Sequence, residues 1–451
     1  MSTQPWSRRR FLATSALAAG AAGASTLLPG GMAATDAAAD RGVTTITVMY
    51  GTGELSSQEV KVFEQQNLSI KVRQINWDTV RLSAMLAAGQ PPDFIRINGA
   101  TDMPSIAARG LAIPLDPYIK TSKVIKPQDI MPANNIFRWD GKAQGQGPYY
   151  GLGKDFGPET QIWYNKKLFH QAGVKDLDPL KPITYDELLT LGKKLTVRKG
   201  GKTVIYGLDM AWPFGWVYMQ IVQSLAQMGK TLWNSDYTQA RFTDPDVLKI
   251  LQWYVDWAQA RVGHSPLDPD PDGWAAPAFE SDRLAMVVYG YWFQGAISSG
   301  PKGLEDRIGF APSPQWGSIR LSGELTGSGS WIPVASKNKD AAWKFMEYFF
   351  TNKPAIDRAT SGWGVPCYQP YLKNMPAATA PQREYNRVLL NDLKYFQVLR
   401  FSPYIAGNAM SSLITKYLTP VMMGQAPLRQ AATQLETAVN AQLRANKEAI
   451  G

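Results

Sequence analysis

Residues 44–50 read TTITVMY, residues 70–75 read IKVRQI and residues 94–98 read FIRIN. Each run is rich in β-branched and other apolar residues, a composition that is typical of β-strands. A helical pattern follows each of the first two runs, and Ser56 and Asp78 are placed to cap these helices. Strands that alternate with amphipathic helices of about 10 to 12 residues predict an α/β sheet whose neighbouring strands are parallel.

The later chain continues this alternation less regularly. The run IWY at 162–164 predicts a short strand, and Asn165 begins a helical pattern directly after it. Thr184 is placed as an N-cap, with Glu187 as its capping-box partner. Residues 206–208 predict a return to extended structure. Further helical patterns cover residues 246–259, 340–350, 382–390 and 428–443.

The N-terminus carries the run SRRRFL at 7–12, followed by an Ala/Gly/Leu-rich stretch to about Pro29. Paired arginines before a weakly hydrophobic segment predict a twin-arginine export signal. Ala37 and Ala39 fit a signal-peptidase site before Asp40. We therefore expect residues 1–39 to be removed and the remaining chain to be a soluble periplasmic protein; a retained N-terminal anchor is the alternative.

The composition argues against several kinds of site. The chain has one cysteine, Cys367, so we expect no internal disulfide after export. Neither His170 nor His264 lies at ligand spacing from a cysteine or the other histidine, so we expect no metal site of the common zinc types and no cofactor.

The formal net charge is +10, from 47 Lys+Arg against 37 Asp+Glu. The basic residues are scattered along the sequence, whereas nucleic-acid binding needs a clustered basic face, so we expect no nucleic-acid partner. The basic balance leaves open an anionic ligand or an anionic membrane face. A surface charge that only keeps the chain soluble is the plainer alternative.

Several segments match one known pattern in a fixed order. They are LAAGQPPDF at 86–94, GLAIPLD at 110–116, YNKKLF at 164–169, TYDEL at 184–188, RLAMV at 283–287 and GYW at 290–292. Together they resemble the family 1 extracellular solute-binding proteins, the carbohydrate receptors of ABC importers, which include maltose-binding protein. The resemblance covers nearly all of the chain after the leader. One departure is Tyr291, which stands where the family usually has proline.

The resemblance implies a type II-like periplasmic binding protein fold, with two α/β lobes joined by a hinge and the ligand in the cleft between them. On this basis we expect residues 40–155 with 306–337 to form the N-terminal lobe. Residues 156–305 with 338–451 would form the C-terminal lobe. Crossings are expected near 154–157, 302–308 and 335–339. The implied partners are a carbohydrate ligand and the permease subunits of an ABC transporter, and we expect a monomer.

The candidate ligand residues follow from the chemistry of sugars. A sugar presents apolar C–H faces and a rim of hydroxyls, so a receptor needs aromatic platforms and planar polar groups. Ligands in open α/β sheets lie beyond the carboxyl ends of strands. The residues at these positions after the first three strands are Tyr50, Thr52, Glu54, Trp77, Asp78, Asn98, Thr101 and Asp102.

A second group of candidates comes from the crossing segments and the second lobe. By resemblance, Trp292 is the best single candidate for a platform that stacks on a sugar. A core position is the alternative for each tryptophan, and Trp253 and Trp257, which are four residues apart, are expected in the core. The further candidates are Asp155, Glu159, Trp212, Phe214, Ser328, Trp331 and Trp363.

The sequence leaves two other functions open beside the sugar receptor. Asp155 and Glu159 are two carboxylates near aromatic residues, which a glycosidase or lyase could use as its acid and base or nucleophile. Ligand hydrogen bonding or hinge structure is the preferred interpretation of this pair, and we expect no enzyme. The second alternative keeps the receptor but gives it an anionic ligand, such as a uronate or a phosphorylated polyol.

Overall fold

The structure is a computed structural model that describes residues 42–212, 216–325 and 328–450. The described residues from Val43 onward form one compact unit. The predicted leader and the candidate ligand residue Phe214 lie outside the described residues. Among the helices that the structure describes, none is long and apolar enough to cross a membrane.

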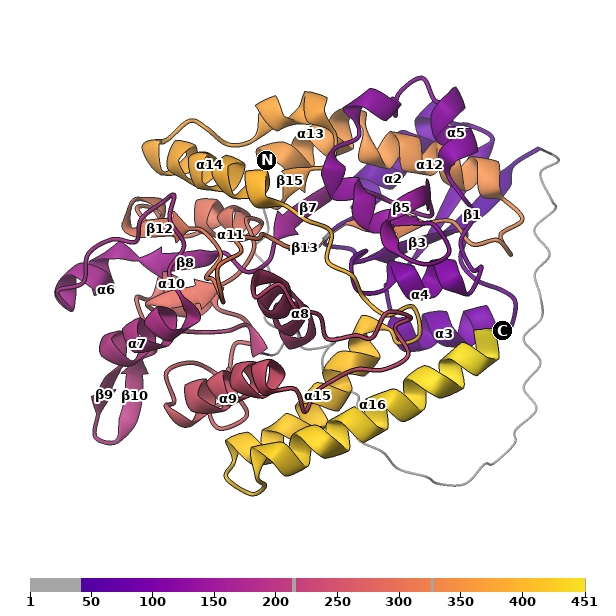
Figure 1. The fold of residues 1–451 in the computed structure, drawn as a ribbon. Helices are drawn as coiled ribbons and strands as arrows, with labels where there is room; N and C mark the ends of the chain where they lie inside the picture. The colour runs from indigo at the N-terminus through magenta and orange to yellow at the C-terminus, as the bar shows by residue number, and fades with distance from the viewer. Residues whose placement is uncertain (1–41, 213–215, 326–327, 451) are drawn as a thin grey trace, which may run out of the picture. The chain divides into compact units, whose positions relative to one another are not determined.

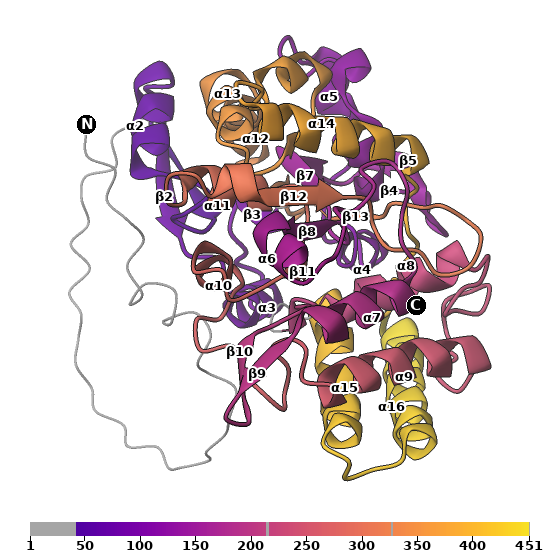
Figure 2. The same cartoon turned by 90° about the vertical axis from the view of Figure 1, so that its left-hand side faces the viewer.

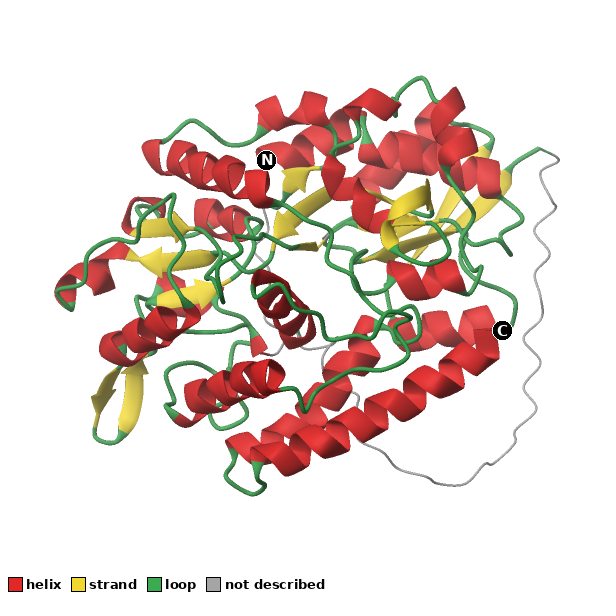
Figure 3. Cartoon of the chain, in the orientation of Figure 1, coloured by secondary structure: helices red, strands yellow, loops and turns green. Residues whose placement is uncertain are grey.

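Most of the regular structure is helical (Figures 1 and 3). The longer helices are α2 (Ser57–Gln66), α3 (Thr79–Ala87), α7 (Tyr185–Leu195), α8 (Val217–Gln227), α9 (Pro245–Gln259), α12 (Lys339–Phe350), α13 (Asn352–Thr360), α14 (Ala380–Asp392), α15 (Gly407–Met422) and α16 (Leu428–Ile450). The shorter helices are α4 (Met103–Ala108), α5 (Asp116–Thr121), α6 (Lys166–Gln171), α10 (Ala276–Glu280) and α11 (Phe293–Ser299).

The strands are short, and they come from all parts of the described chain. They are β1 (Thr44–Met49), β2 (Ile70–Ile75), β3 (Phe94–Ile97), β4 (Arg138–Trp139), β5 (Gln144–Tyr149), β6 (Leu152–Gly153), β7 (Asp155–Pro158), β8 (Ile162–Asn165), β9 (Val197–Lys199), β10 (Lys202–Ile205), β11 (Met286–Val288), β12 (Ile308–Ala311), β13 (Glu324–Leu325), β14 (Gly329–Trp331) and β15 (Val365–Pro366).

The largest sheet has five strands in the order β2-β1-β3-β14-β6. Strand β1 pairs in parallel with β2 and with β3, which confirms the predicted parallel neighbours. Strand β14 comes from much later in the chain and pairs antiparallel with β3 and β6. This sheet is therefore completed only when the distant return segment inserts beside β3.

A second sheet has the order β11-β8-β12, and both neighbours of β8 are antiparallel to it. The predicted extended segment at 206–208 lies beside this sheet, because Tyr206 and Asp209 form isolated parallel bridges with Leu284 and Val287. A third sheet joins β13 and β15 to β7, the strand that leads from the first sheet toward the second.

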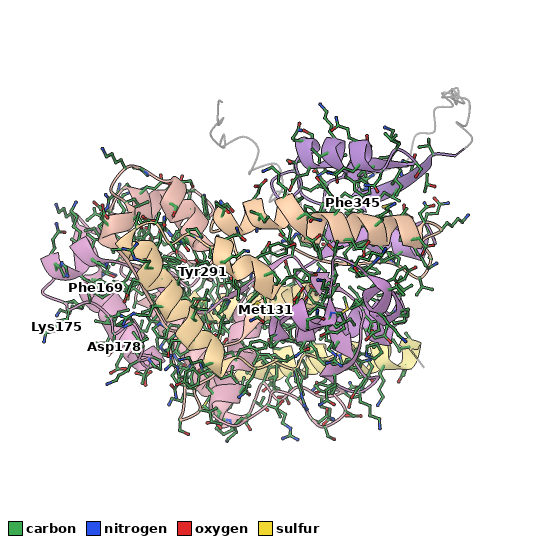
Figure 4. All side chains as sticks on the ribbon, turned by 90° about the horizontal axis from the view of Figure 1, so that it is seen from above. Met131, Phe169, Lys175, Asp178, Tyr291 and Phe345 are labelled. Carbon is green, nitrogen blue, oxygen red and sulfur yellow. The ribbon has the colours of Figure 1, made fainter. Side chains whose placement is uncertain are left out.

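Two elements contact the sheet of the other predicted lobe, and not the sheet of the lobe in which they are expected. Strand β12, expected in the N-terminal lobe, pairs with β8, because all four of its residues are apolar or glycine and are buried there. Helix α12, expected in the C-terminal lobe, packs against β1 and α2 instead. Phe345, which is labelled in Figure 4, lies on this helix. Its ring centre lies 5.0 Å from that of Phe63 and 5.2 Å from that of Phe94. The division into lobes stays a prediction. On these contacts, β12 would belong to the C-terminal lobe and α12 to the N-terminal lobe.

Helices α8, α9, α15 and α16 pack on one another, and α9, α15 and α16 lie near each other in both views (Figures 1 and 2). Trp253 and Trp257 of α9 are buried, as predicted. The Trp253 indole N–H donates to the Tyr185 carbonyl at 2.9 Å, and that of Trp257 donates to the Leu208 carbonyl at 2.9 Å. These two buried indoles thus each keep a hydrogen-bond partner.

The predicted helix starts are confirmed in detail. Ser56 and Thr184 each form a complete capping box with the glutamate three residues later. Asp78 accepts hydrogen bonds from the backbone of the first turn of α3, and Asn165 caps α6 in the same way. These signals are local, which is why the sequence alone places them correctly.

Asp93 ties the late return segment to the first sheet. It is 8% exposed, and its carboxylate accepts the Thr47 backbone N–H at 2.7 Å. The other oxygen accepts the Ser336 hydroxyl at 2.6 Å and the Asn338 side-chain amide at 3.3 Å. One buried carboxylate therefore holds β1 and the residues before α12 together.

We expect Asp93→Ala to lower the free energy of unfolding by about 2–3 kcal/mol, because it leaves buried donors without an acceptor. Urea unfolding monitored by tryptophan fluorescence measures this change. Asp357→Ala is the control: Asp357 is exposed and pairs with Lys353 four residues earlier, so its loss should cost less than about 0.5 kcal/mol. Equal effects of the two substitutions would contradict the role given to Asp93.

Candidate functional site

Arg96 on β3 brings together three candidate residues from the ends of three strands. Its guanidinium donates to both carboxylate oxygens of Glu54, at 2.6 and 2.8 Å, and to the Asn98 side-chain oxygen at 2.7 Å. The same guanidinium lies 4.5 Å above the Trp77 ring. Burial acts to lower the pKa of Arg96, but the adjacent Glu54 carboxylate outweighs it and raises the pKa. Arg96 is not among the ligand candidates predicted from the sequence.

Asp155 on β7 pairs with a second arginine. The Arg358 Nε of α13 donates to one Asp155 oxygen at 2.8 Å, and Nη2 lies 3.5 Å from the other. Asp155 is 1% exposed. Burial acts to lower the pKa of Arg358, while the charge of Asp155, helped by Glu54, raises it above its usual value. Each of these two arginines therefore has a carboxylate partner inside the fold.

Lys154, the residue before Asp155, is also buried. Its Nζ lies 3.7 Å from the nearer Glu59 carboxylate oxygen of α2 and 3.8 Å from the centre of the Phe349 ring of α12. Burial lowers the pKa of Lys154 to about 8, although the Glu59 carboxylate opposes this change. Lys154 and Asp155, at the start of β7, are thus a buried cation and a buried anion next to each other in the chain.

Glu159 follows β7 and contacts the leading platform candidate. The Trp292 indole N–H donates to a Glu159 carboxylate oxygen at 2.8 Å. Two glycines make room for this carboxyl group: a Cβ at Gly290 would lie 2.8 Å from one oxygen, and a Cβ at Gly157 would lie 3.1 Å from the other. Burial raises the pKa of Glu159 to about 8, and the charge of Asp155 adds to this effect.

Trp292 is the centre of a group of partly exposed tryptophans, Trp216, Trp292 and Trp363, which we call the tryptophan group. The Trp363 ring lies 6.2 Å from that of Trp292, with an interplanar angle of 12°. The Trp216 ring lies 6.1 Å from Trp292 and is nearly perpendicular to it. Because Glu159 holds the Trp292 indole N–H, this ring has a fixed orientation within the group.

Three candidates around β14 are buried. Tyr50 is fully buried, and its hydroxyl donates to the Ser328 backbone carbonyl at 2.8 Å and accepts the Ser330 hydroxyl at 3.0 Å. Ser328 is 1% exposed, and Trp331 is fully buried in the hydrophobic core. Tyr50 therefore joins the end of β1 to the return segment, next to the charged groups that surround Glu54.

Other candidates make their contacts apart from these groups. Thr52 and Asp78 are exposed, and Asp78 caps α3. Asp102 accepts the Gly407 backbone N–H at 2.8 Å, at the first residue of α15. Thr101 lies against the same glycine, since a Cβ at Gly407 would come within 2.6 Å of the Thr101 Cβ. Trp212 is partly buried, 6.4 Å from the rings of Tyr254 and Trp257.

The sequence could not have revealed Arg96 and Arg358 as site residues. A lone arginine on a strand or a helix carries no local signal, and each becomes part of the site only through its distant carboxylate. Within the described ranges, no group of three or more histidine, cysteine or acidic side chains is placed to hold a metal ion. Ligand contact by any of the candidates stays a prediction.

Comparison with known proteins gives a family match. The sequence model of the family described as "Bacterial extracellular solute-binding protein" matches residues 51–356. The maltotriose-binding protein of Pyrococcus abyssi is 25% identical over 308 residues, which cover 65% of this chain and 58% of that protein. The diacetylchitobiose-binding protein DasA of Streptomyces coelicolor is 24% identical over 411 residues, 88% of this chain and 89% of that protein. An uncharacterized ABC transporter extracellular-binding protein of Pyrococcus horikoshii is 22% identical over 316 residues, 65% of that protein. The match thus spans less than two thirds of the length of this relative and of the maltotriose-binding protein.

The fold is shared with solved structures. The substrate-binding protein Lmo0181 of Listeria monocytogenes, solved in complex with cycloalternan, superposes with a TM-score of 0.72 at 23% identity. The superposition covers 88% of this chain and 98% of that one. This likeness agrees with the predicted two-lobe α/β class.

The buried Glu159 carboxyl group predicts a pH dependence of stability. Its pKa is about 8 in the folded chain against an ordinary 4.5, so the folded state holds this proton more tightly than the unfolded state does. Its contribution to the free energy of unfolding is therefore complete below pH 4.5 and is lost as the pH rises to about 8.

We expect Glu159→Gln, which keeps an acceptor for Trp292 but cannot ionise, to show a flatter decline of unfolding free energy across this window. Urea unfolding at a series of pH values measures the difference between the two proteins. The other titrating groups are common to both, so they cancel. Parallel curves would mean that Glu159 has an ordinary pKa.

Proposed function

Because this chain belongs to the bacterial extracellular solute-binding protein family, we propose that it captures a neutral carbohydrate and delivers it to the permease of an ABC importer. The observation that carries the carbohydrate assignment is the tryptophan group, with Trp292 fixed by Glu159 through its indole N–H. Flat aromatic rings match the apolar faces of sugars, and adjacent carboxylate and guanidinium groups match their hydroxyls. The relatives named for maltotriose and diacetylchitobiose support the same ligand class.

The pairing of charges favours a neutral ligand over an anionic one. Arg96 is bonded to Glu54, and Arg358 is bonded to Asp155. An anionic ligand would have to displace the buried Asp155 carboxylate or the partly buried Glu54 carboxylate from its arginine, which would leave that carboxylate without its partner. A hydroxyl can bond to the edge of either pair without breaking it. The uronate and phosphorylated-polyol alternatives therefore lack support from this geometry.

The same contacts favour binding without catalysis. A hydrolase needs one carboxyl group as proton donor and another as base or nucleophile, both directed at the scissile bond. Asp155 is instead bonded to Arg358, and Glu159 accepts the Trp292 indole N–H. We infer that these carboxyl groups orient the site and that the ligand leaves unchanged.

The location follows from the N-terminal segment. The paired arginines at 8–10 and the small residues before Asp40 support export by the twin-arginine route, cleavage near Ala39 and a periplasmic receptor. A ligand that contacts both lobes would favour the closed state over the open one. The permease would then receive a loaded, closed receptor.

A thermal-shift screen of neutral sugars tests the ligand class. We expect at least one mono- or oligosaccharide to raise the unfolding temperature, because a ligand that binds only the folded state stabilises it. The matching uronic acid should give a smaller shift, and chromatography after prolonged incubation should recover the sugar intact. Failure of every neutral sugar would refute the carbohydrate assignment, and turnover would favour the enzyme.

Trp292→Phe tests the platform once a sugar is identified. We expect about tenfold weaker binding by titration calorimetry, since an aromatic contact is worth about 0.5–1.5 kcal/mol and the hydrogen bond to Glu159 is lost as well. Trp343→Phe is the matched control. Trp343 lies on α12, outside the tryptophan group, and its ring packs 5.3 Å from that of Tyr118. The same loss of affinity in both variants would show that Trp292 has no special role.

A further inference from the structure

The hairpin of β9 and β10 extends from the end of α7 away from the neighbouring helices (Figures 1 and 2). Its strands pair antiparallel, with Lys199 opposite Lys202. The turn between them is Gly200-Gly201, and both glycines have positive φ, at 56° and 76°. Two glycines of this conformation are typical of a tight type I′ hairpin turn, so the tip has a defined shape.

The basic residues are less scattered than expected from the sequence, because this hairpin and its base concentrate positive charge. Residues 188–208 contain five basic residues and no Asp or Glu. Arg261, at the end of α9, lies beside them, because the Arg198 guanidinium donates to the Ala260 carbonyl at 2.6 Å and to the Arg261 carbonyl at 3.3 Å. We call the resulting set the basic hairpin surface; it consists of Lys193, Lys194, Arg198, Lys199, Lys202 and Arg261, all exposed.

These cations lack the carboxylate partners that several other exposed lysines have. Lys71, Lys167 and Lys447 each form an ion pair with an acidic side chain. Among the described residues, no carboxylate lies within ion-pair distance of any member of the basic hairpin surface. The nearby acidic side chains are engaged elsewhere: Asp268 accepts the Tyr206 hydroxyl, and Asp209 lies 2.9 Å from the His264 ring.

An uncompensated group of like charges lowers the stability of the fold by self-repulsion, and it produces a positive potential that an anionic surface can neutralise. We propose that the basic hairpin surface binds the anionic phospholipid headgroups of the membrane beside which the receptor works. The choice of membrane rests on the proposed function, because a receptor that delivers its ligand to a permease must return repeatedly to a lipid surface.

The expected strength suits a transient contact. Each lysine or arginine near an anionic membrane contributes about 1 kcal/mol. The six members of the surface are all exposed, and contacts between exposed charges are screened by salt, so binding should be reversible and reduced by salt. Such binding raises the concentration of receptor next to the permease without holding it there.

Sedimentation with lipid vesicles tests this proposal on the full chain. The wild-type protein should bind vesicles that contain phosphatidylglycerol at low salt, bind phosphatidylcholine vesicles much less, and be released at high salt. The double variant Lys199→Glu/Lys202→Glu should bind the anionic vesicles at least tenfold more weakly, since two favourable charges become unfavourable ones.

The double variant Lys142→Glu/Lys373→Glu is the matched control, because it changes the net charge equally at exposed positions outside the hairpin. It should keep most of the vesicle binding. Equal binding by wild type and hairpin variant, or an equal loss in hairpin variant and control, would overturn the proposal. A hairpin variant that binds vesicles normally but fails to stimulate its permease would also overturn it, in favour of a protein partner.

The sugar-induced thermal shift keeps this test separate from that of the proposed function. The hairpin variant should keep the wild-type shift, because its substitutions lie away from Trp292 and the arginine pairs. Loss of vesicle binding with the shift intact supports the membrane contact. Vesicle binding without any sugar response would leave the hairpin assignment standing and refute the carbohydrate.

Discussion

Three ionisable side chains buried within six residues constrain the rest of this structure. Lys154, Asp155 and Glu159 lie on or beside β7, and each is 3% exposed or less. A buried charge is costly unless it is paired, and a buried polar group is costly unless it is hydrogen-bonded, so each of the three needs a partner from another part of the chain. Their partners come from α2 and α12, from α13, and from the segment before α11. Strand β7 can occupy its position only when these distant elements do.

The proposed ligand site depends on that arrangement. Pairing Arg358 with Asp155 leaves the site with balanced charge, and the bond from Trp292 to Glu159 fixes the ring that we expect to stack on a sugar. The polar groups are thus oriented before any ligand arrives, which reduces the ordering cost of binding. The basic hairpin surface lies on other elements, so capture of a ligand and contact with a membrane can be altered independently.

Much of the local structure could be predicted from the sequence. The helix cap at Ser56, the capping box at Thr184 and the parallel strands around β1 are predicted from the sequence and confirmed. The lobe boundaries stay a prediction, and the sequence carries no sign that β12 pairs with β8 or that α12 packs against β1 and α2, because these contacts depend on apolar fit between distant segments. The site arginines Arg96 and Arg358 were missed, since an arginine acquires a role only when the fold supplies its carboxylate.

The sequence by itself determined the elements and the family, because strand composition, helix caps and ordered motifs act over a few residues. It also determined which side chains were available, namely 15 tryptophans, a single cysteine and two histidines. Only the tertiary structure decided which tryptophan is held by a carboxyl group, which arginines are neutralised, and where unpaired lysines gather. Those outcomes depend on pairing between residues far apart in the chain, and such pairing is set by burial and packing.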